Sequence, residues 1–119
     1  MVDNALSPHG GSLTERLASS EEAGERIRGL PRVAVRDQLA REVVNIAYGF
    51  FSPIEGFMGR ADVDAVARHM TLDSGYVWSI PIVFDIPQEH VARLGVGPGD
   101  SLLLTYQDQP LAVLDVEEI

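Results

Sequence analysis

The stretch SLLLTYQDQPLAVLDV, residues 101–116, predicts two β-strands joined by a polar turn, and it decides the fold. Its first part is mostly apolar, its middle carries residues that favour a turn, and its last part is again mostly apolar. The second strand ends close to Ile119, so its outer edge is expected to lack a neighbour in this chain. We therefore expect the sheet to be incomplete at its C-terminal end, with fraying or self-association over residues 101–119.

Most of the preceding sequence predicts helices. Ser19 and the glutamates that follow Ser20 mark a helix start, and this helix is expected to end near Gly29. Residues 37–48 and 62–70 carry apolar side chains at helical spacing, and a short helix is expected after the proline at position 87. These segments indicate a helical layer that stands mainly before the final hairpin.

Two further segments favour extended structure. Residues 32–36, RVAVR, alternate valine with arginine or alanine, and residues 76–86, YVWSIPIVFDI, are the most strand-like run of the chain. Pro81 has no N–H group, so we expect it at a sheet edge or a bulge. Asp62 is expected to cap the helix that begins there. The order of the elements predicts an α+β domain and not a βαβ repeat.

Composition excludes several classes of function. The formal net charge is −9, and every basic side chain is an arginine, so the surface is expected to repel nucleic-acid phosphates. There is no cysteine, which excludes disulfides, thiolate catalysis and cysteine-based zinc sites. No apolar run approaches the roughly 20 residues of a membrane span, and residues 1–5 do not resemble a secretory signal. A cytoplasmic protein is expected.

Two loops are the strongest candidates for a site. In Ser7-Pro8-His9-Gly10-Gly11 the paired glycines would let a backbone approach an anion closely, or the segment is a rigid tether that docks the N-terminal arm. The aromatic-rich segment 49–59 could line a substrate pocket, or it is a buried connector that packs against another domain. We favour the tether and the connector.

Other patterns do not assemble a recognisable active site. Ser52 has no nucleophile-elbow motif around it, and the glycines at 95, 97 and 99 lack the spacing and the lysine of a P-loop. His9, His69 and His90 lie far apart and form no His-x-x-His motif. A metal site could still assemble in space, although surface or capping roles are the simpler interpretation. The residues alone predict an α+β domain with no visible active site.

Taken together, four motifs resemble the N-terminal part of ATP sulfurylase (sulfate adenylyltransferase), in the form found in archaea and in sulfur-metabolising bacteria. They are SPHGG at residues 7–11, AYGFFSPIEGFM at 47–58, VWSIPIVFD at 77–85 and GD at 99–100. Each motif alone is weakly specific, but their order and spacing extend the resemblance over nearly the whole chain.

The resemblance implies a PUA-like fold, with a β-barrel-like mixed sheet and flanking helices. In this family such a domain precedes a nucleotidyltransferase domain, which joins ATP and sulfate into adenosine 5′-phosphosulfate and pyrophosphate during sulfur metabolism. The family's Gln-x-Arg-Asn and His-x-x-His segments, which bind the anions, do not occur in residues 1–119. The resemblance therefore implies no catalytic, cofactor-binding or metal-binding residue here. ATP and magnesium would bind to the full enzyme.

We accordingly interpret residues 1–119 as a truncated PUA-like domain without the family's catalytic domain. Whether this chain alone is an enzyme is left open. The expected partner is that catalytic domain, in the same or another chain, and a homo-oligomer is left open. An alternative is a stand-alone PUA-like module that binds RNA or protein, with RNA opposed by the charge. The candidate structural or interface residues are Ser7, Pro8, His9, Gly10, Gly11, Phe51, Ser52, Pro53, Glu55, Gly56, Phe57, Met58 and Trp78.

Overall fold

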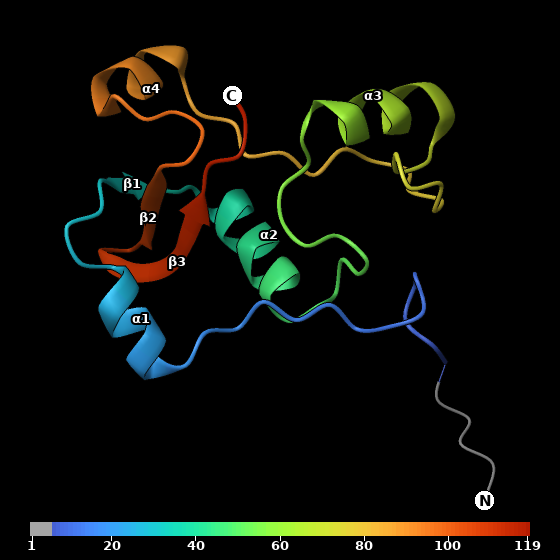
Figure 1. Cartoon of the computed structure of the whole chain (residues 1–119), viewed down its shortest axis with the longest axis horizontal. Coiled ribbons are helices and arrows are strands. Elements are labelled where there is room, and N and C mark those ends of the chain that lie inside the picture. Colours follow the sequence, from blue (N-terminus) through green and yellow to red (C-terminus); the bar gives the residue numbers. More distant parts are fainter. Residues whose placement is uncertain (1–5) are drawn as a thin grey trace, which may run out of the picture. The chain divides into compact units, whose positions relative to one another are not determined.

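The computed structural model describes residues 6–119 (Figure 1). The expectations for residues 1–5, that they carry no secretory signal and begin an extended arm, lie outside the described residues. The chain forms two compact units. We call residues 6–17 and 44–81 the arm unit, and residues 18–43 and 82–119 the sheet unit.

The sheet unit is built on a three-stranded mixed sheet in the order β1-β2-β3 (Figure 1). The central strand β2 (Ser101–Tyr106) runs parallel to β1 (Arg32–Ala34) and antiparallel to β3 (Gln109–Asp115). Leu102, Leu103 and Leu104 of β2 are each at most 2% exposed, so the central strand supplies the core of this unit. The predicted hairpin and the short first strand are both confirmed.

The hairpin turn has a local cause in the sequence. Tyr106 pairs with Gln109, which leaves Gln107 and Asp108 as a two-residue loop, and both adopt positive φ angles of 49° and 62°. A two-residue loop with positive φ at both positions matches the right-handed twist of the strands. β3 lies at one edge of the sheet, where a proline within a strand is tolerated, and Pro110 follows this loop.

Helix α1 (Ser20–Arg26) begins at the predicted place. The Ser19 hydroxyl accepts a hydrogen bond from the Glu22 N–H at 3.2 Å, and the Glu22 carboxylate accepts one from the Ser19 N–H at 2.9 Å. This reciprocal capping satisfies two N–H groups that the first helical turn leaves free. At the other end, Arg26 forms an exposed ion pair of 2.6 Å with Asp115 of β3.

The other helices follow the predicted periodicity with one correction. α2 (Asp37–Ala47) buries its apolar face, and α4 (Gln88–Leu94) begins after the proline at position 87, as expected. α3 (Arg60–His69) begins two residues before Asp62, so the prediction that Asp62 caps it is wrong. The Asp62 carboxylate instead accepts a hydrogen bond of 2.9 Å from the Asp73 N–H, because the chain turns back past the helix end.

The strand predicted over residues 76–86 is also wrong. The segment makes a single isolated bridge, between Thr71 and Val77, and enters no sheet. The backbone N–H of Trp78 donates to the Met70 carbonyl at 2.9 Å, so this segment pairs with the turn that precedes it. Pro81 lies in no strand, so the expectation of a sheet edge or a bulge there is also wrong. The segment is rich in apolar residues, but within residues 6–119 no second strand lies beside it to form a ladder.

The described residues confirm an α+β domain with a mixed sheet and flanking helices, four helices and three strands in all. None of the helices within residues 6–119 combines the length and the apolar character needed to cross a lipid bilayer.

Candidate functional site

The arm lies against the aromatic-rich loop within the arm unit. The Gly11 N–H donates to the Pro8 carbonyl at 2.9 Å, which closes a turn, and Gly10 adopts a φ of +81°. A Cβ atom at Gly10 would lie 2.7 Å from Pro53 Cβ, closer than carbon atoms approach in folded proteins. Position 10 therefore needs glycine for two reasons, the left-handed backbone and the close approach to the proline ring.

Ser52 ties the loop to the arm. Its hydroxyl donates to the Gly49 carbonyl at 2.6 Å and accepts from the Thr14 N–H at 2.9 Å, and the residue is 5% exposed. The Arg16 N–H extends this contact by donating to the Ala47 carbonyl at 2.9 Å. The Ser52 hydroxyl is thus engaged in two backbone hydrogen bonds, which gives it a structural role in holding the arm.

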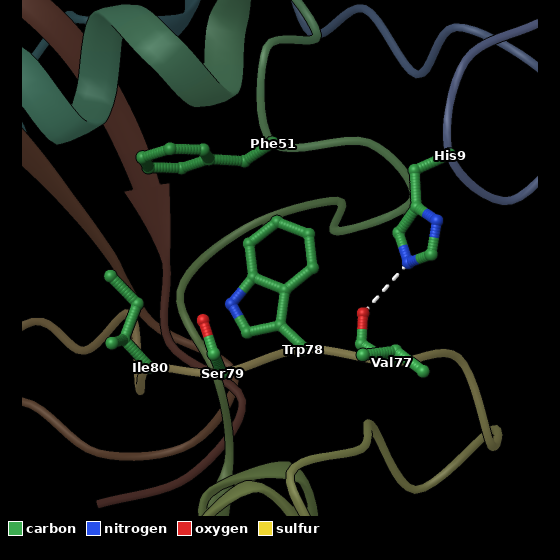
Figure 2. Close-up of a pocket in the computed structure, with 6 residues that line it drawn as sticks. All are labelled: His9, Phe51, Val77, Trp78, Ser79 and Ile80. Atoms are coloured by element: carbon green, nitrogen blue, oxygen red, sulfur yellow. Dashed lines mark hydrogen bonds between the residues drawn. The ribbon is translucent and has the colours of Figure 1, made fainter.

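His9 joins the arm to the segment that contains the single tryptophan. Its Nε2 lies 2.8 Å from the Val77 carbonyl oxygen, so this nitrogen carries the proton and donates (Figure 2). The imidazole also stands edge-on to Tyr76, with ring centroids 5.6 Å apart, and 6.3 Å from the Trp78 ring. One polar contact and two ring contacts therefore fix the arm on residues 76–78.

Beside this contact is a pocket of about 470 Å³, which we call the tryptophan pocket. It is open to solvent on one side, and its lining surface is almost wholly apolar. Phe51 stands perpendicular to Trp78, with ring centroids 5.9 Å apart, so two aromatic rings form its corner. Its lining residues are His9, Phe51, Val77, Trp78, Ser79 and Ile80 (Figure 2).

The indole Nε1 of Trp78 is buried and has no hydrogen-bond partner among residues 6–119. Figure 2 shows this nitrogen on the side of the ring that faces Phe51 and Ile80, away from His9. An indole N–H is a donor only, and a buried donor without an acceptor costs about 1–3 kcal/mol. Each unsatisfied buried group in a folded protein calls for an explanation, and this one belongs to a residue that lines a pocket.

The chemistry of the tryptophan pocket is that of an apolar contact surface. Its lining includes no arginine, aspartate or glutamate, so it offers no charged group for a phosphate or sulfate. No group of three or more metal-ligating side chains exists among residues 6–119. His69 and His90 are exposed on α3 and α4 and do not line the tryptophan pocket, so the open prediction of a spatial histidine cluster finds no support there.

Three exposed side chains have displaced pKa values, and all three belong to the sheet unit. The Ser19 N–H and hydroxyl lower the pKa of Glu22, and the hydrogen bond from Arg36 lowers the pKa of Asp85. The hydrogen bond to the Asp37 carboxylate raises the pKa of the Tyr106 phenol. Hydrogen bonds on the surface account for all three shifts: a helix cap at Glu22, an ion pair at Asp85 and a phenol–carboxylate contact at Tyr106.

The arm unit contains all the candidate residues named from the sequence, but they do not form one cluster. Contacts bring together Gly10 with Pro53, and His9 with Trp78, as described above. Ser7, Pro8 and Glu55 are exposed, whereas Gly56, Phe57 and Met58 are half-buried, and none of these lines the tryptophan pocket. Sequence reasoning missed Val77 and Ile80, although their place beside the tryptophan in a run of apolar residues was a usable signal.

Known proteins place this architecture in a family. A model described as PUA-like domain matches residues 6–119, which is nearly the whole chain. The chain belongs to the PUA-like domain family. Among curated relatives, it is 42% identical over 118 residues to the sulfate adenylyltransferase of Cenarchaeum symbiosum, covering 99% of this chain and 30% of that enzyme. It is 41% identical over 115 residues to the sulfate adenylyltransferase of Hyperthermus butylicus, covering 94% of this chain and 29% of that enzyme.

A solved structure shares the PUA-like architecture. The hexameric APS kinase from Thiobacillus denitrificans superimposes with a TM-score of 0.79 and 28% sequence identity, covering 92% of this chain and 22% of that one. The resemblance to the sulfate adenylyltransferase family and the expected PUA-like fold are both confirmed. This PUA-like domain spans about 30% of the length of the curated relatives that it matches.

Proposed function

We propose that the chain is the non-catalytic PUA-like domain of a sulfate adenylyltransferase, and that it supports the part of the enzyme that transfers the adenylyl group of ATP to sulfate. One observation carries this proposal. The match to sulfate adenylyltransferases extends over 94–99% of this chain at about 40% identity, yet it accounts for only 29–30% of those enzymes. The domain is therefore recognisable as one component of a larger enzyme.

The geometry of the arm unit supports a structural role. Two of the polar candidates, Ser52 and His9, bind backbone atoms of other segments. Ser52 joins the loop at 49–59 to Thr14, and His9 joins the arm at 7–11 to Val77, so these segments offer a preformed surface to the rest of the enzyme. The ATP, sulfate and magnesium sites are assigned by this proposal to that remainder, in the same polypeptide or in a second one.

Assembly and location follow the same reasoning. The structural neighbour with the PUA-like architecture is described as hexameric, which favours the homo-oligomer that the sequence left open for the complete enzyme. Sulfate activation consumes ATP, so a cytoplasmic location remains our prediction for the enzyme to which this domain belongs.

A chimera tests the proposal. Residues 6–119 replace the matched 115-residue segment of the Hyperthermus butylicus enzyme, and sulfate-dependent ATP–pyrophosphate exchange is measured beside the parent enzyme. We expect a folded chimera with exchange activity comparable to that of the parent. The control is the parent enzyme with the segment deleted, which should be unstable or inactive. An insoluble or inactive chimera, beside an active parent, would contradict the proposed role.

A further inference from the structure

We propose that the tryptophan pocket receives an apolar side chain from a segment of the remaining enzyme, and that a backbone carbonyl of that segment accepts a hydrogen bond from Trp78 Nε1. This inference rests on the proposed function. The inference adds to that function by naming the surface of the PUA-like domain that contacts the rest of the enzyme and the interactions formed there.

The unpaired indole N–H is the first support. Trp78 Nε1 is buried but makes no hydrogen bond within residues 6–119. An indole can only donate, so its missing partner must be an oxygen or another acceptor. An acceptor supplied by a docking segment would satisfy the donor once the side chains that cover Nε1 move aside. Aromatic side chains with one polar atom are frequent centres of binding energy at protein interfaces for this reason.

The apolar wall is the second support. Val77 and Ile80 line the tryptophan pocket and are 68% and 60% exposed, although both are strongly apolar. Beside them, Phe51 and Trp78 supply the faces of two aromatic rings. When an apolar side chain displaces water from such a surface, the buried apolar area stabilises the complex. An apolar residue of a docking segment fits both features, because its side chain can contact the apolar lining and its backbone carbonyl can accept from the indole N–H.

The charge and the openness of the pocket argue against three other occupants: an anion, a second copy of this chain and a free small molecule. A nucleotide, sulfate or RNA phosphate would need cationic partners, and no arginine lines the tryptophan pocket. A second copy of this chain would bring another net charge of −9 to the contact, which opposes association. A free small molecule is disfavoured because small-molecule sites enclose most of their ligand, whereas this pocket is open.

The length of the relatives identifies the source of the docking segment. The sulfate adenylyltransferases that match this chain are more than three times as long as the segment they share with it, since the match covers 29–30% of each. The unshared part is therefore large enough to supply a docking segment. The pocket is also preorganised, because the His9 hydrogen bond to the Val77 carbonyl fixes the segment that carries the tryptophan. Preorganisation lowers the entropy that docking must overcome.

The first test places a carboxylate in the pocket. Ile80→Glu is made in the Hyperthermus butylicus chimera and in the 119-residue chain, and melting temperatures are compared. The matched control is Leu17→Glu, because Leu17 is 55% exposed, lies in the same unit and does not line the pocket. We expect Ile80→Glu to lower the melting temperature of the chimera by about 2 °C more than that of the chain alone, the order of shift that one lost contact produces in a larger protein. Leu17→Glu should show no such difference. Equal shifts in chimera and chain for Ile80→Glu would overturn the proposal.

The second test follows the indole itself. Hydrogen exchange of residues 76–80 should be slower in the chimera than in the chain alone, and Trp78→Phe, which removes the N–H and keeps an aromatic ring, should reduce that protection. An active chimera whose residues 76–80 exchange as fast as in the isolated chain would refute the docking inference and leave the proposed function standing. An inactive chimera would refute the proposed function itself. Protection in the isolated chain that grows with its concentration would show that a second copy is the occupant, which also overturns the proposal.

Discussion

The close approach of Gly10 to Pro53 predicts an unusually large effect for adding one methyl group. An alanine at position 10 would carry the φ of +81°, and its Cβ would stand 2.7 Å from Pro53 Cβ and 3.0 Å from Pro53 Cγ. The left-handed backbone alone costs an L-residue about 1–2 kcal/mol. Because the proline ring cannot rotate away, relieving the overlap adds about 1–3 kcal/mol, as for other overpacked sites. We expect Gly10→Ala to destabilise the protein by about 2–5 kcal/mol, from the sum of those two costs.

Gly11 provides a matched control. Its φ is +94°, but a Cβ atom there would meet nothing within 4 Å. Gly11→Ala therefore carries the backbone cost without the overlap, and the difference between the two variants isolates the contact with Pro53. With a urea m-value of about 2 kcal/mol/M, a difference of roughly 2 kcal/mol separates the two unfolding midpoints by about 1 M.

Tryptophan fluorescence is the assay, because Trp78 is the single tryptophan and lies in the arm unit with both glycines. Urea titrations of the parent chain, Gly10→Ala and Gly11→Ala at one protein concentration give the three midpoints. If the two alanine variants unfold at the same urea concentration, the arm is not seated on Pro53, and the account of the tether at residues 7–11 is wrong.

Three further predictions follow from other parts of the structure. Ser52→Ala should lower the free energy of unfolding by about 1–3 kcal/mol in urea titrations, because it leaves the Thr14 N–H without an acceptor; an unchanged midpoint would disprove that contact. The Ser19 cap lowers the pKa of Glu22 from its ordinary value of 4.5, so the ionised carboxylate stabilises the folded state above pH 4.5, and this stabilisation is lost as the pH falls through the lower folded pKa. Circular dichroism should show that Glu22→Gln abolishes this pH dependence of helix α1. An unaltered pH profile in the variant would contradict the role of the cap. In a gel-shift titration at low salt, structured RNA should not bind, because the net charge is −9; tight, salt-sensitive binding would favour the stand-alone RNA module instead.

The elements that could be predicted from the sequence are those with local causes. The Ser19 cap depends on residues three apart, and the hairpin turn depends on two adjacent residues. A few neighbouring residues therefore determine each of these structures. Helix α2 was predictable because its buried face repeats at helical spacing. None of these features needs information about distant partners.

The failures share the opposite cause. Residues 76–86 have the composition of a strand, but a strand also needs a partner along its length. Sequence alone does not reveal that residues 6–119 supply none. The mistaken cap at Asp62 arose because a carboxylate near a helix start can accept from any nearby N–H, and here the Asp73 N–H is reached instead. The unpaired Trp78 Nε1 depends on the positions of several segments, so no sequence pattern could have indicated it.

Sulfate-dependent ATP–pyrophosphate exchange by the purified 119-residue chain tests the central claim most directly. The claim is that this PUA-like domain supports adenylyl transfer without performing it. We predict no exchange above a no-protein blank for the chain alone, under conditions in which the Hyperthermus butylicus enzyme is active. Sulfate-dependent turnover by the chain alone would show that the catalytic groups lie within residues 1–119, and the account would be wrong.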